Sequence, residues 1–159
     1  MKQAVLISAC LLGVRCRYDG ACKGHRLAQA LADRYQLIPV CAEQLGGLAT
    51  PRVPAERVGS RVKTKDGRDV TREYALGAQE VLRLATLFDC KLAILKERSP
   101  SCGSGQIYDG SFTGRLIAAN GVTAQLLQQN GVRVVGESQL EELLAIETAA
   151  ATESEKAQS

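Results

Sequence analysis

Four short apolar runs set the architecture that this chain can adopt. Each run is bounded by polar or glycine-containing segments and is typical of a buried strand. The runs are residues 4–9, 37–42, 91–96 and 132–136. Apolar residues at helical spacing separate them and predict helices over residues 25–35, 71–88, 122–129 and 138–148. Strands that alternate with helices predict a three-layer, Rossmann-like α/β domain with a mainly parallel sheet.

One domain accounts for most of the chain. Its 159 residues are 45% hydrophobic, which is enough apolar material for one packed core. We therefore expect a single domain over residues 1–148. Residues 149–159 are small and polar, and we expect them to form a flexible C-terminal tail.

Charge and hydropathy narrow the range of partners. The formal net charge of +3 gives no general reason to wrap DNA or to coat an anionic membrane. The first apolar run is too short for a secretory core, and no window approaches the roughly 20 apolar residues of a spanning helix. We therefore expect a soluble, cytoplasmic protein without membrane association. The sequence leaves its oligomeric state open.

Two segments interrupt the alternation of strands and helices. Residues 45–68 contain prolines, several glycines and many basic side chains, which indicates a long loop. Residues 99–112 (SPSCGSGQIYDGSF) are rich in glycine and serine and follow the third apolar run. Long ordered loops in compact domains are usually functional.

Three of the six cysteines occur where parallel strands end. Cys10 ends the first apolar run, Cys41 ends the second, and Cys102 lies just beyond the third. Ligands of open α/β sheets bind at this carboxyl edge, so the three thiols would converge if the strands are neighbours. Three thiolates suit a soft metal or an iron–sulfur cluster. Each cysteine taken alone also fits simple burial in the core.

The other cysteines have less distinctive positions. Cys90, between a helix and a strand, is typical of core packing, whereas Cys16 and Cys22 either complete a site or lie in a partly exposed loop. The sequence has no Cys-x-x-Cys pair and a single histidine, His25. These absences argue against a zinc ribbon, a thioredoxin-type site and imidazole-based catalysis.

Polar residues beside these cysteines are candidates for catalysis or binding. Glu43 follows Cys41 and is either a solvated carboxylate or a general acid or base. Ser99, Ser101 and Ser104 are either turn residues or hydrogen-bond donors to cluster sulfurs or an anion, with the backbone amide of Gly103 nearby.

The motifs together resemble a known family. They are SACLLG, RYDG, C-A-E-x-x-G-G-L-x-T-P-R, DVT, SPSCGSGQIYDGSF and NGV, spread over residues 8–137. This combination is similar to the single-domain thiouracil and thiouridine desulfidases, long catalogued as a domain of unknown function (DUF523-like). SPSCG together with GGLxTPR is the most specific part of the resemblance.

The resemblance implies an iron–sulfur hydrolase. In this family a [4Fe-4S] cluster is bound by three cysteines, carried onto Cys10, Cys41 and Cys102, and the fourth iron stays open for the thiocarbonyl sulfur of the substrate. Water then replaces sulfide without a redox step. Glu43 corresponds to the catalytic carboxylate and Ser99 to a serine implicated in catalysis.

The implied substrate is a thiolated uracil: 4-thiouridine monophosphate, 4-thiouracil or 2-thiouracil. For a substrate phosphate we expect contacts from the Ser/Gly segment and the basic loop. The candidates are Ser101, Gly103, Ser104 and Arg52, with Arg57, Arg61 and Lys63 as further basic residues.

Three alternatives remain open from the sequence. The enzyme could act on 4-thiouridine within tRNA, which a continuous basic patch would favour. The protein could be a non-catalytic iron–sulfur redox sensor, which a fourth ligand from Cys16 or Cys22 would favour. It could also be a structural zinc domain with tetrahedral cysteine coordination.

Overall fold

A four-stranded parallel sheet forms the centre of the protein. The computed structural model describes residues 1–22 and 24–158. The strands are β1 (Ala4–Ser8), β2 (Gln36–Val40), β5 (Leu92–Leu95) and β8 (Arg133–Gly136). They lie in the order β2-β1-β5-β8, and every neighbouring pair is parallel. These strands coincide with the four apolar runs, so the predicted parallel sheet is confirmed.

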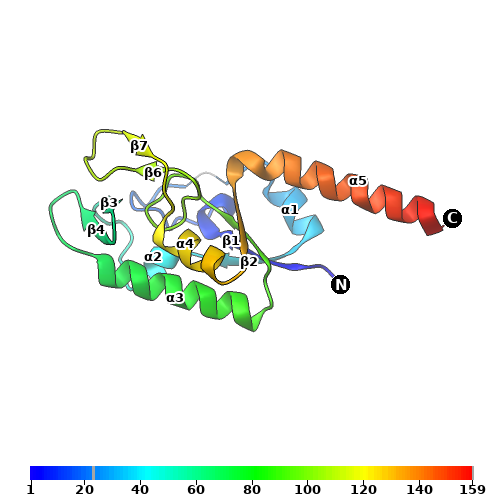
Figure 1. Cartoon of the computed structure of the whole chain (residues 1–159), viewed down its shortest axis with the longest axis horizontal. Helices are drawn as coiled ribbons and strands as arrows, with labels where there is room; N and C mark the ends of the chain where they lie inside the picture. The colour runs from blue at the N-terminus through cyan, green and yellow to red at the C-terminus, as the bar shows by residue number, and fades with distance from the viewer. Residues whose placement is uncertain (23, 159) are drawn as a thin grey trace.

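Helices cover both faces of the sheet and complete the three layers (Figure 1). They are α1 (Ala28–Arg34), α2 (Ala42–Leu45), α3 (Thr71–Leu87), α4 (Val122–Gln129) and α5 (Leu140–Gln158). On one face Ile7 of β1 packs in a core with Leu31 of α1 and Leu140 of α5. On the other face Leu6 packs in a core with Val81 of α3 and with α4. The alternation of Leu6 and Ile7 between the two cores is the period-two pattern of a strand that is buried on both sides.

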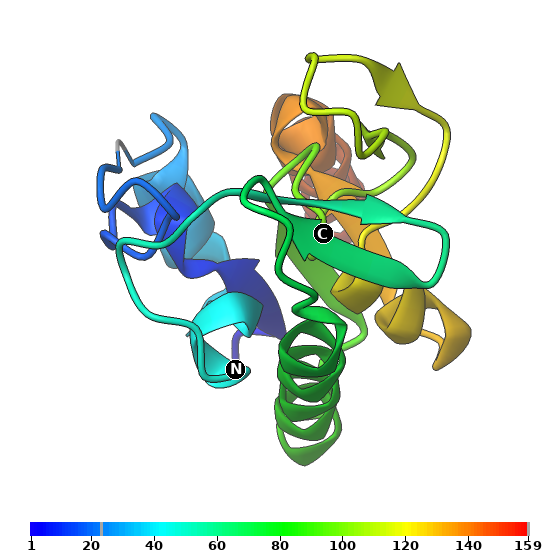
Figure 2. The ribbon, with the colours of Figure 1, turned by 90° about the vertical axis from the view of Figure 1, so that its left-hand side faces the viewer.

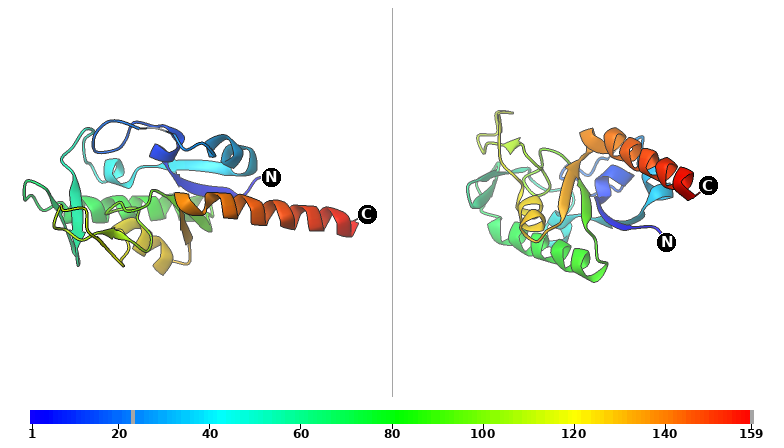
Figure 3. Two further views of the ribbon diagram at one scale, coloured as in Figure 1. Left: turned by 90° about the horizontal axis from the view of Figure 1, so that it is seen from above. Right: turned by 45° about the vertical axis from the view of Figure 1, so that its right-hand side comes forward.

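Helix α5 is longer than the sequence suggested. It continues to Gln158, so residues 149–158 are helical, although we expected the helix to end near residue 148. Ser159 lies outside the described residues. Figures 1 and 3 show the distal part of α5 projecting from the body of the domain. Within the described residues, no helix has both the length and the apolar character needed to cross a bilayer.

The two segments that interrupt the alternation contain short antiparallel hairpins. Residues 45–68 include β3 (Ala55–Val58) and β4 (Arg61–Thr64), so the prediction of a simple loop is wrong there. The Ser/Gly segment leads into a second pair, β6 (Ile107–Tyr108) and β7 (Leu116–Ile117). Figure 2 views this end of the molecule, where β3 contacts β6.

A buried carboxylate joins these two hairpins. Glu56 of β3 accepts hydrogen bonds at Oε1 from the backbone N–H groups of Gly110 (2.9 Å) and Phe112 (3.1 Å). Gly110 has a φ of 100°, and a Cβ there would collide with Val58. Glycine is therefore required in the YDGSF motif for the turn to meet the hairpin.

Two glycines let helices α2 and α3 touch backbone to backbone. A Cβ on Gly46 would overlap the Glu73 carbonyl oxygen, and a Cβ on Gly77 would overlap the Ala42 carbonyl oxygen. This contact brings the turn that carries Glu43 against α3. The first glycine of the Gly-Gly pair in the CAEQLGG motif therefore has a structural role.

Gly77→Ala should destabilise the fold, although alanine is the better helix former by about 1 kcal/mol. The added Cβ has to force two backbones apart, and overpacking of this kind costs about 1–3 kcal/mol. Set against the gain in helix propensity, this cost should lower the free energy of unfolding, measured by urea denaturation, by up to about 2 kcal/mol. Leu76→Ala, at the exposed neighbouring position, is the control and should cost less. A Gly77→Ala variant as stable as the parent would contradict the close α2–α3 packing.

Candidate functional site

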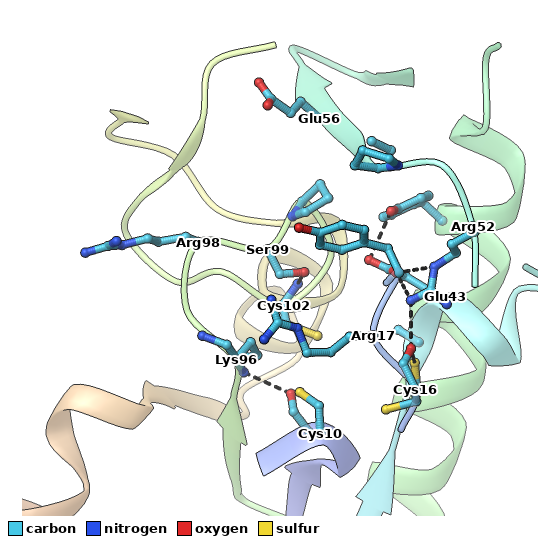
Figure 4. Close-up of a pocket in the computed structure, with 18 of the residues that line it drawn as sticks. Cys10, Cys16, Arg17, Glu43, Arg52, Glu56, Lys96, Arg98, Ser99 and Cys102 are labelled. Atoms are coloured by element: carbon cyan, nitrogen blue, oxygen red, sulfur yellow. Dashed lines mark hydrogen bonds and ion pairs between the residues drawn. The ribbon is translucent and has the colours of Figure 1, made fainter. Parts of the chain in front are cut away.

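A cavity of about 480 Å³ opens at the carboxyl edge of the sheet. Residues at the ends of β1, β2 and β5 line it, and residues of β3 and of the segment 96–114 close it from the other side. Basic, acidic and thiol side chains share this lining (Figure 4). This is the edge at which open parallel sheets bind their ligands.

The structure brings the three predicted cysteines together in this cavity. Cys10 lies in a 3-10 turn directly after β1, and Cys41 is the residue between β2 and α2. Cys102 follows β5 in the Ser/Gly segment. All three line the cavity, and so does Cys16. Figure 4 shows Cys10, Cys16 and Cys102 around the same space.

Burial and mutual repulsion disfavour the bare thiolates at this site. Burial, with the nearby Cys102, raises the pKa of Cys10 to about 12. Burial also raises the pKa of Cys102 to about 12, while hydrogen bonds from the Ser8 and Ser101 hydroxyl groups lower it. Thiolates in such surroundings need a cationic centre to hold them deprotonated. The donor set therefore fits an iron–sulfur cluster that compensates the thiolate charge.

The spacing of the ligand groups bears on the kind of metal centre. In the part of the chain that the structure describes, no three Cys, His, Asp or Glu side chains lie close enough to hold a single metal ion. In a cluster each thiolate binds its own iron, so the sulfurs lie farther apart than around one ion. Three thiols in one cavity lining, each able to bind one iron, match the ligand set of a cluster.

The loop that carries Cys102 is fixed by Ser99 and by helix α4. Ser99 Oγ accepts hydrogen bonds from the N–H groups of Ser101 and Cys102, both at 3.1 Å. The N–H groups of Val122 and Thr123 at the start of α4 donate to the carbonyls of Pro100 (2.9 Å) and Ser101 (2.8 Å). Ser99 lines the cavity, and because its oxygen accepts two bonds, its O–H is left to donate.

Glu43 is held by two partners inside the cavity. Arg52 donates to Glu43 Oε2 from Nε at 2.8 Å and from Nη2, and the Tyr74 hydroxyl donates to Oε1 at 3.0 Å. The pair is largely buried, with 8% of the Arg52 side chain and 14% of the Glu43 side chain exposed. Burial, and then the charge of Glu43, raises the pKa of Tyr74, which keeps its hydroxyl protonated as a donor.

The contacts of Arg52 differ from the role that the sequence suggested. Besides Glu43, its guanidinium donates to the carbonyls of Ala49 (3.1 Å) and Cys16 (2.9 Å) and to Thr50 Oγ1 (3.0 Å). These bonds engage all the N–H groups of a guanidinium. Arg52 is therefore placed to orient Glu43, and these contacts disfavour the predicted phosphate contact.

The other predicted anion-binding residues lie outside the cavity lining. Ser101 is buried and hydrogen-bonds Thr123 (2.8 Å), and the N–H of Gly103 donates to the Ser99 carbonyl (2.9 Å). Ser104 accepts a hydrogen bond from the Gln128 side chain at 3.2 Å. All three therefore support the loop around Cys102, and phosphate binding by them stays a prediction.

The sequence did not predict several of the lining residues. Lys96 directly follows β5 at the same edge as the cysteines and contacts Glu137 at 2.5 Å, and its charge offsets part of the rise in the pKa of Cys10. The strand-end rule that identified Cys102 would also have selected Lys96. No signal in the sequence pointed to Tyr74, since it lies within an ordinary helical pattern.

Comparisons with known proteins point to one family. A family model described as 2-thiouracil desulfurase matches residues 5–139. The uncharacterized protein YbbK of Bacillus subtilis (strain 168) is 42% identical over 150 residues, which cover 88% of this chain and 99% of YbbK. The solved structure of the [4Fe-4S]-dependent thiouracil desulfidase TudS is 45% identical and superimposes with a TM-score of 0.86, covering 94% of this chain and 99% of that one.

Arg52→Met should destabilise the protein by about 3 kcal/mol, because it leaves the Glu43 carboxylate buried without its cation. Arg61→Met is the matched control, since Arg61 pairs with Asp69 at 3.4 Å on the surface, where solvent screens the pair, and its loss should cost much less. Adding Glu43→Gln to Arg52→Met should recover part of the loss. Urea denaturation checks all three, and equal losses for the two single variants would refute the structural role of the buried pair.

Proposed function

Because this chain belongs to the 2-thiouracil desulfurase family, we propose that it is a [4Fe-4S]-dependent enzyme that replaces the thiocarbonyl sulfur of a thiolated uracil with oxygen. One observation carries the proposal: three thiols from distant parts of the chain line the same cavity as a carboxylate held in place by Arg52 and Tyr74. The thiols can bind the cluster, and the carboxylate can orient and deprotonate a water molecule.

We assign the cluster to Cys10, Cys41 and Cys102. When bound through three thiolates, a [4Fe-4S] cluster supplies one iron with an open position, a soft Lewis acid for a thiocarbonyl sulfur. The Ser8 and Ser101 hydroxyl groups donate toward the Cys102 sulfur and stabilise its thiolate. Cys90 lies in the core between the sheet and α3, outside the cavity, and takes no part.

Glu43 is the proposed general base. Its Oε2 is engaged by Arg52, whereas Oε1 accepts one bond from Tyr74 and keeps a lone pair for a water molecule. Glu43 can orient that water and take a proton from it as the oxygen attacks the ring carbon. The bond to Tyr74 and the ion pair with Arg52 restrict the rotation of the carboxylate, which holds it ready for this step.

Ser99 is the proposed hydrogen-bond donor to the substrate or to the departing sulfur. Its oxygen is fixed by two backbone N–H groups, and its hydrogen remains to donate within the cavity. The overall reaction is balanced without electron transfer: water supplies the new carbonyl oxygen, and the sulfur leaves as hydrogen sulfide or its anion. The reaction therefore needs no redox partner.

The basic lining favours a nucleotide over a free base. Arg17, Lys65, Lys96 and Arg98 line the same cavity as the thiols, and they offer positive charge to a phosphate group. We therefore propose 4-thiouridine monophosphate as the preferred substrate, with 4-thiouracil and 2-thiouracil as weaker ones. We do not favour tRNA as the substrate. The guanidinium groups of Arg52 and Arg57 in the basic loop form hydrogen bonds within the protein, so they do not form a basic surface for RNA.

One observation favours a second candidate, a non-catalytic iron–sulfur sensor. Cys16 lines the cavity and could offer the fourth ligand that such a sensor needs. A sensor with four thiolates does not require a carboxylate held in place as Glu43 is by Arg52 and Tyr74. We therefore favour the enzyme. The release of sulfide from a thiolated uracil separates the two candidates.

The cluster assignment predicts the iron content of cysteine variants. Cys10→Ser, Cys41→Ser and Cys102→Ser should each lose most of the iron and acid-labile sulfide after anaerobic reconstitution, because each removes one of three thiolates. Cys90→Ser is the control and should keep the parental content. Full iron content in any of the three ligand variants would remove that cysteine from the assignment.

The catalytic assignment predicts a defect confined to turnover in Glu43→Gln. The loaded variant should release sulfide from 4-thiouridine monophosphate at least about 100-fold more slowly, the range typical for loss of a general base, with unchanged iron content. Glu80→Gln, at a surface position of α3, should retain full activity. A fully active Glu43→Gln enzyme would exclude Glu43 from catalysis, and a loaded parent that releases no sulfide from any thiolated uracil would refute the proposed function.

A further inference from the structure

A fourth thiol lies in the cavity without a role in the proposed reaction. Cys16 precedes the RYDG motif, is only 2% exposed and lines the cavity. Its backbone carbonyl also accepts a hydrogen bond from Arg52 (2.9 Å), so the Cys16 main chain is anchored to the group that orients Glu43. The position of Cys16 is therefore set by the site itself.

Cys16 and Cys41 are in direct contact. The Cys41 thiol donates to the Cys16 carbonyl with Sγ 3.7 Å from the oxygen, and both cysteines line the same cavity. Two cysteines in contact, each on a short irregular segment, need little backbone movement to reach the geometry of a disulfide. The contact joins a proposed cluster ligand to a cysteine that the cluster does not need.

We propose that Cys16 and Cys41 form a reversible disulfide in the chain when it carries no cluster. The oxidant is a low-molecular-weight disulfide: one S–S bond forms within the protein, the S–S bond of the oxidant breaks, and the two thiol protons go to the two small thiols released. The protein loses two hydrogens and two electrons, and the oxidant gains them. In the loaded protein Cys41 is held by the cluster, so this exchange is blocked.

The disulfide protects the site and regulates its reloading. While its sulfur is part of the disulfide, Cys41 is protected from oxidation to the sulfinic and sulfonic acids, which thiols cannot reduce. It also cannot bind iron until a reductant opens the bond. Cluster loss under oxidising conditions would thus convert the protein into an inactive disulfide form. A thiol reductant would restore its ability to bind the cluster.

Cys22 and Cys10 are the competing pair. The Cys22 thiol donates to the Cys10 carbonyl at 2.6 Å, so these residues are also close. Cys16 and Cys41 both line the open cavity, where a small disulfide can reach them, whereas Cys22 is not part of that lining. This difference favours the Cys16–Cys41 bond.

The sequence makes the test direct. Cleavage after lysine and arginine places each of the six cysteines in a separate peptide, with Cys16 in residues 16–17 and Cys41 in residues 35–52. The full-length protein is stripped of iron by a chelator under reducing conditions, freed of reductant and treated anaerobically with oxidised glutathione. Free thiols are then alkylated, and the digest is analysed by mass spectrometry without reduction.

We expect the parent to lose two of its six free thiols and to yield peptide 35–52 linked to the dipeptide 16–17. Dithiothreitol should restore both thiols and the capacity to take up iron. Cys16→Ser should keep all five of its thiols free. Cys22→Ser and the control Cys90→Ser should each lose two thiols, as the parent does. Protein loaded with its cluster should form the linked peptide at least about tenfold more slowly.

Absence of the linked peptide from the parent, or a dominant link between Cys10 and Cys22, would overturn the inference. The parent digest alone decides this, so the result stands even if a variant folds poorly. The readout is a peptide mass in cluster-free protein and does not require desulfidase activity. A chain that forms the disulfide but releases no sulfide would refute only the proposed function.

Discussion

Parallel pairing of β1 with β2 and with β5 is the constraint on which the rest of the site depends. Parallel strands end at the same edge, so residues far apart in sequence meet there as soon as the sheet forms. Cys10, Cys41 and Cys102 each follow one of these strands and line one cavity. The same edge also presents Lys96. Hydrophobic burial on both faces of the sheet, which builds the domain, therefore also assembles the thiols.

The carboxylate depends on a second, local arrangement. Glycines at the α2–α3 contact allow the two backbones to touch, which sets the turn of Glu43 against the helix of Tyr74. Arg52 then closes the assembly through bonds to Glu43 and to the main chain of Cys16. The motif that runs from Cys41 to Arg52 is thus one structural unit. It supplies a thiol, a carboxylate, the packing glycine and the cation that orients the carboxylate.

The sequence predicted the parts of this structure that follow from local pattern and strand topology. The parallel sheet is confirmed, as is the family resemblance. It did not predict the role of Arg52, because a basic residue in a loop gives no sign of whether its guanidinium faces solvent or a buried carboxylate. The β3–β4 hairpin was missed since its strands are short and rich in charge. The presence of Cys16 in the cavity depends on the path of an irregular segment, which no periodicity encodes.

In the proposed enzyme three thiolates hold one cluster whose fourth iron has no ligand from the protein. A crystal structure of anaerobically loaded protein would show the ligands of each iron. We expect a [4Fe-4S] cluster in the described cavity, bonded to the Sγ atoms of Cys10, Cys41 and Cys102, with the fourth iron facing Glu43. A cluster with Cys16 or Cys22 bound to the fourth iron, or a single metal ion in place of the cluster, would contradict it.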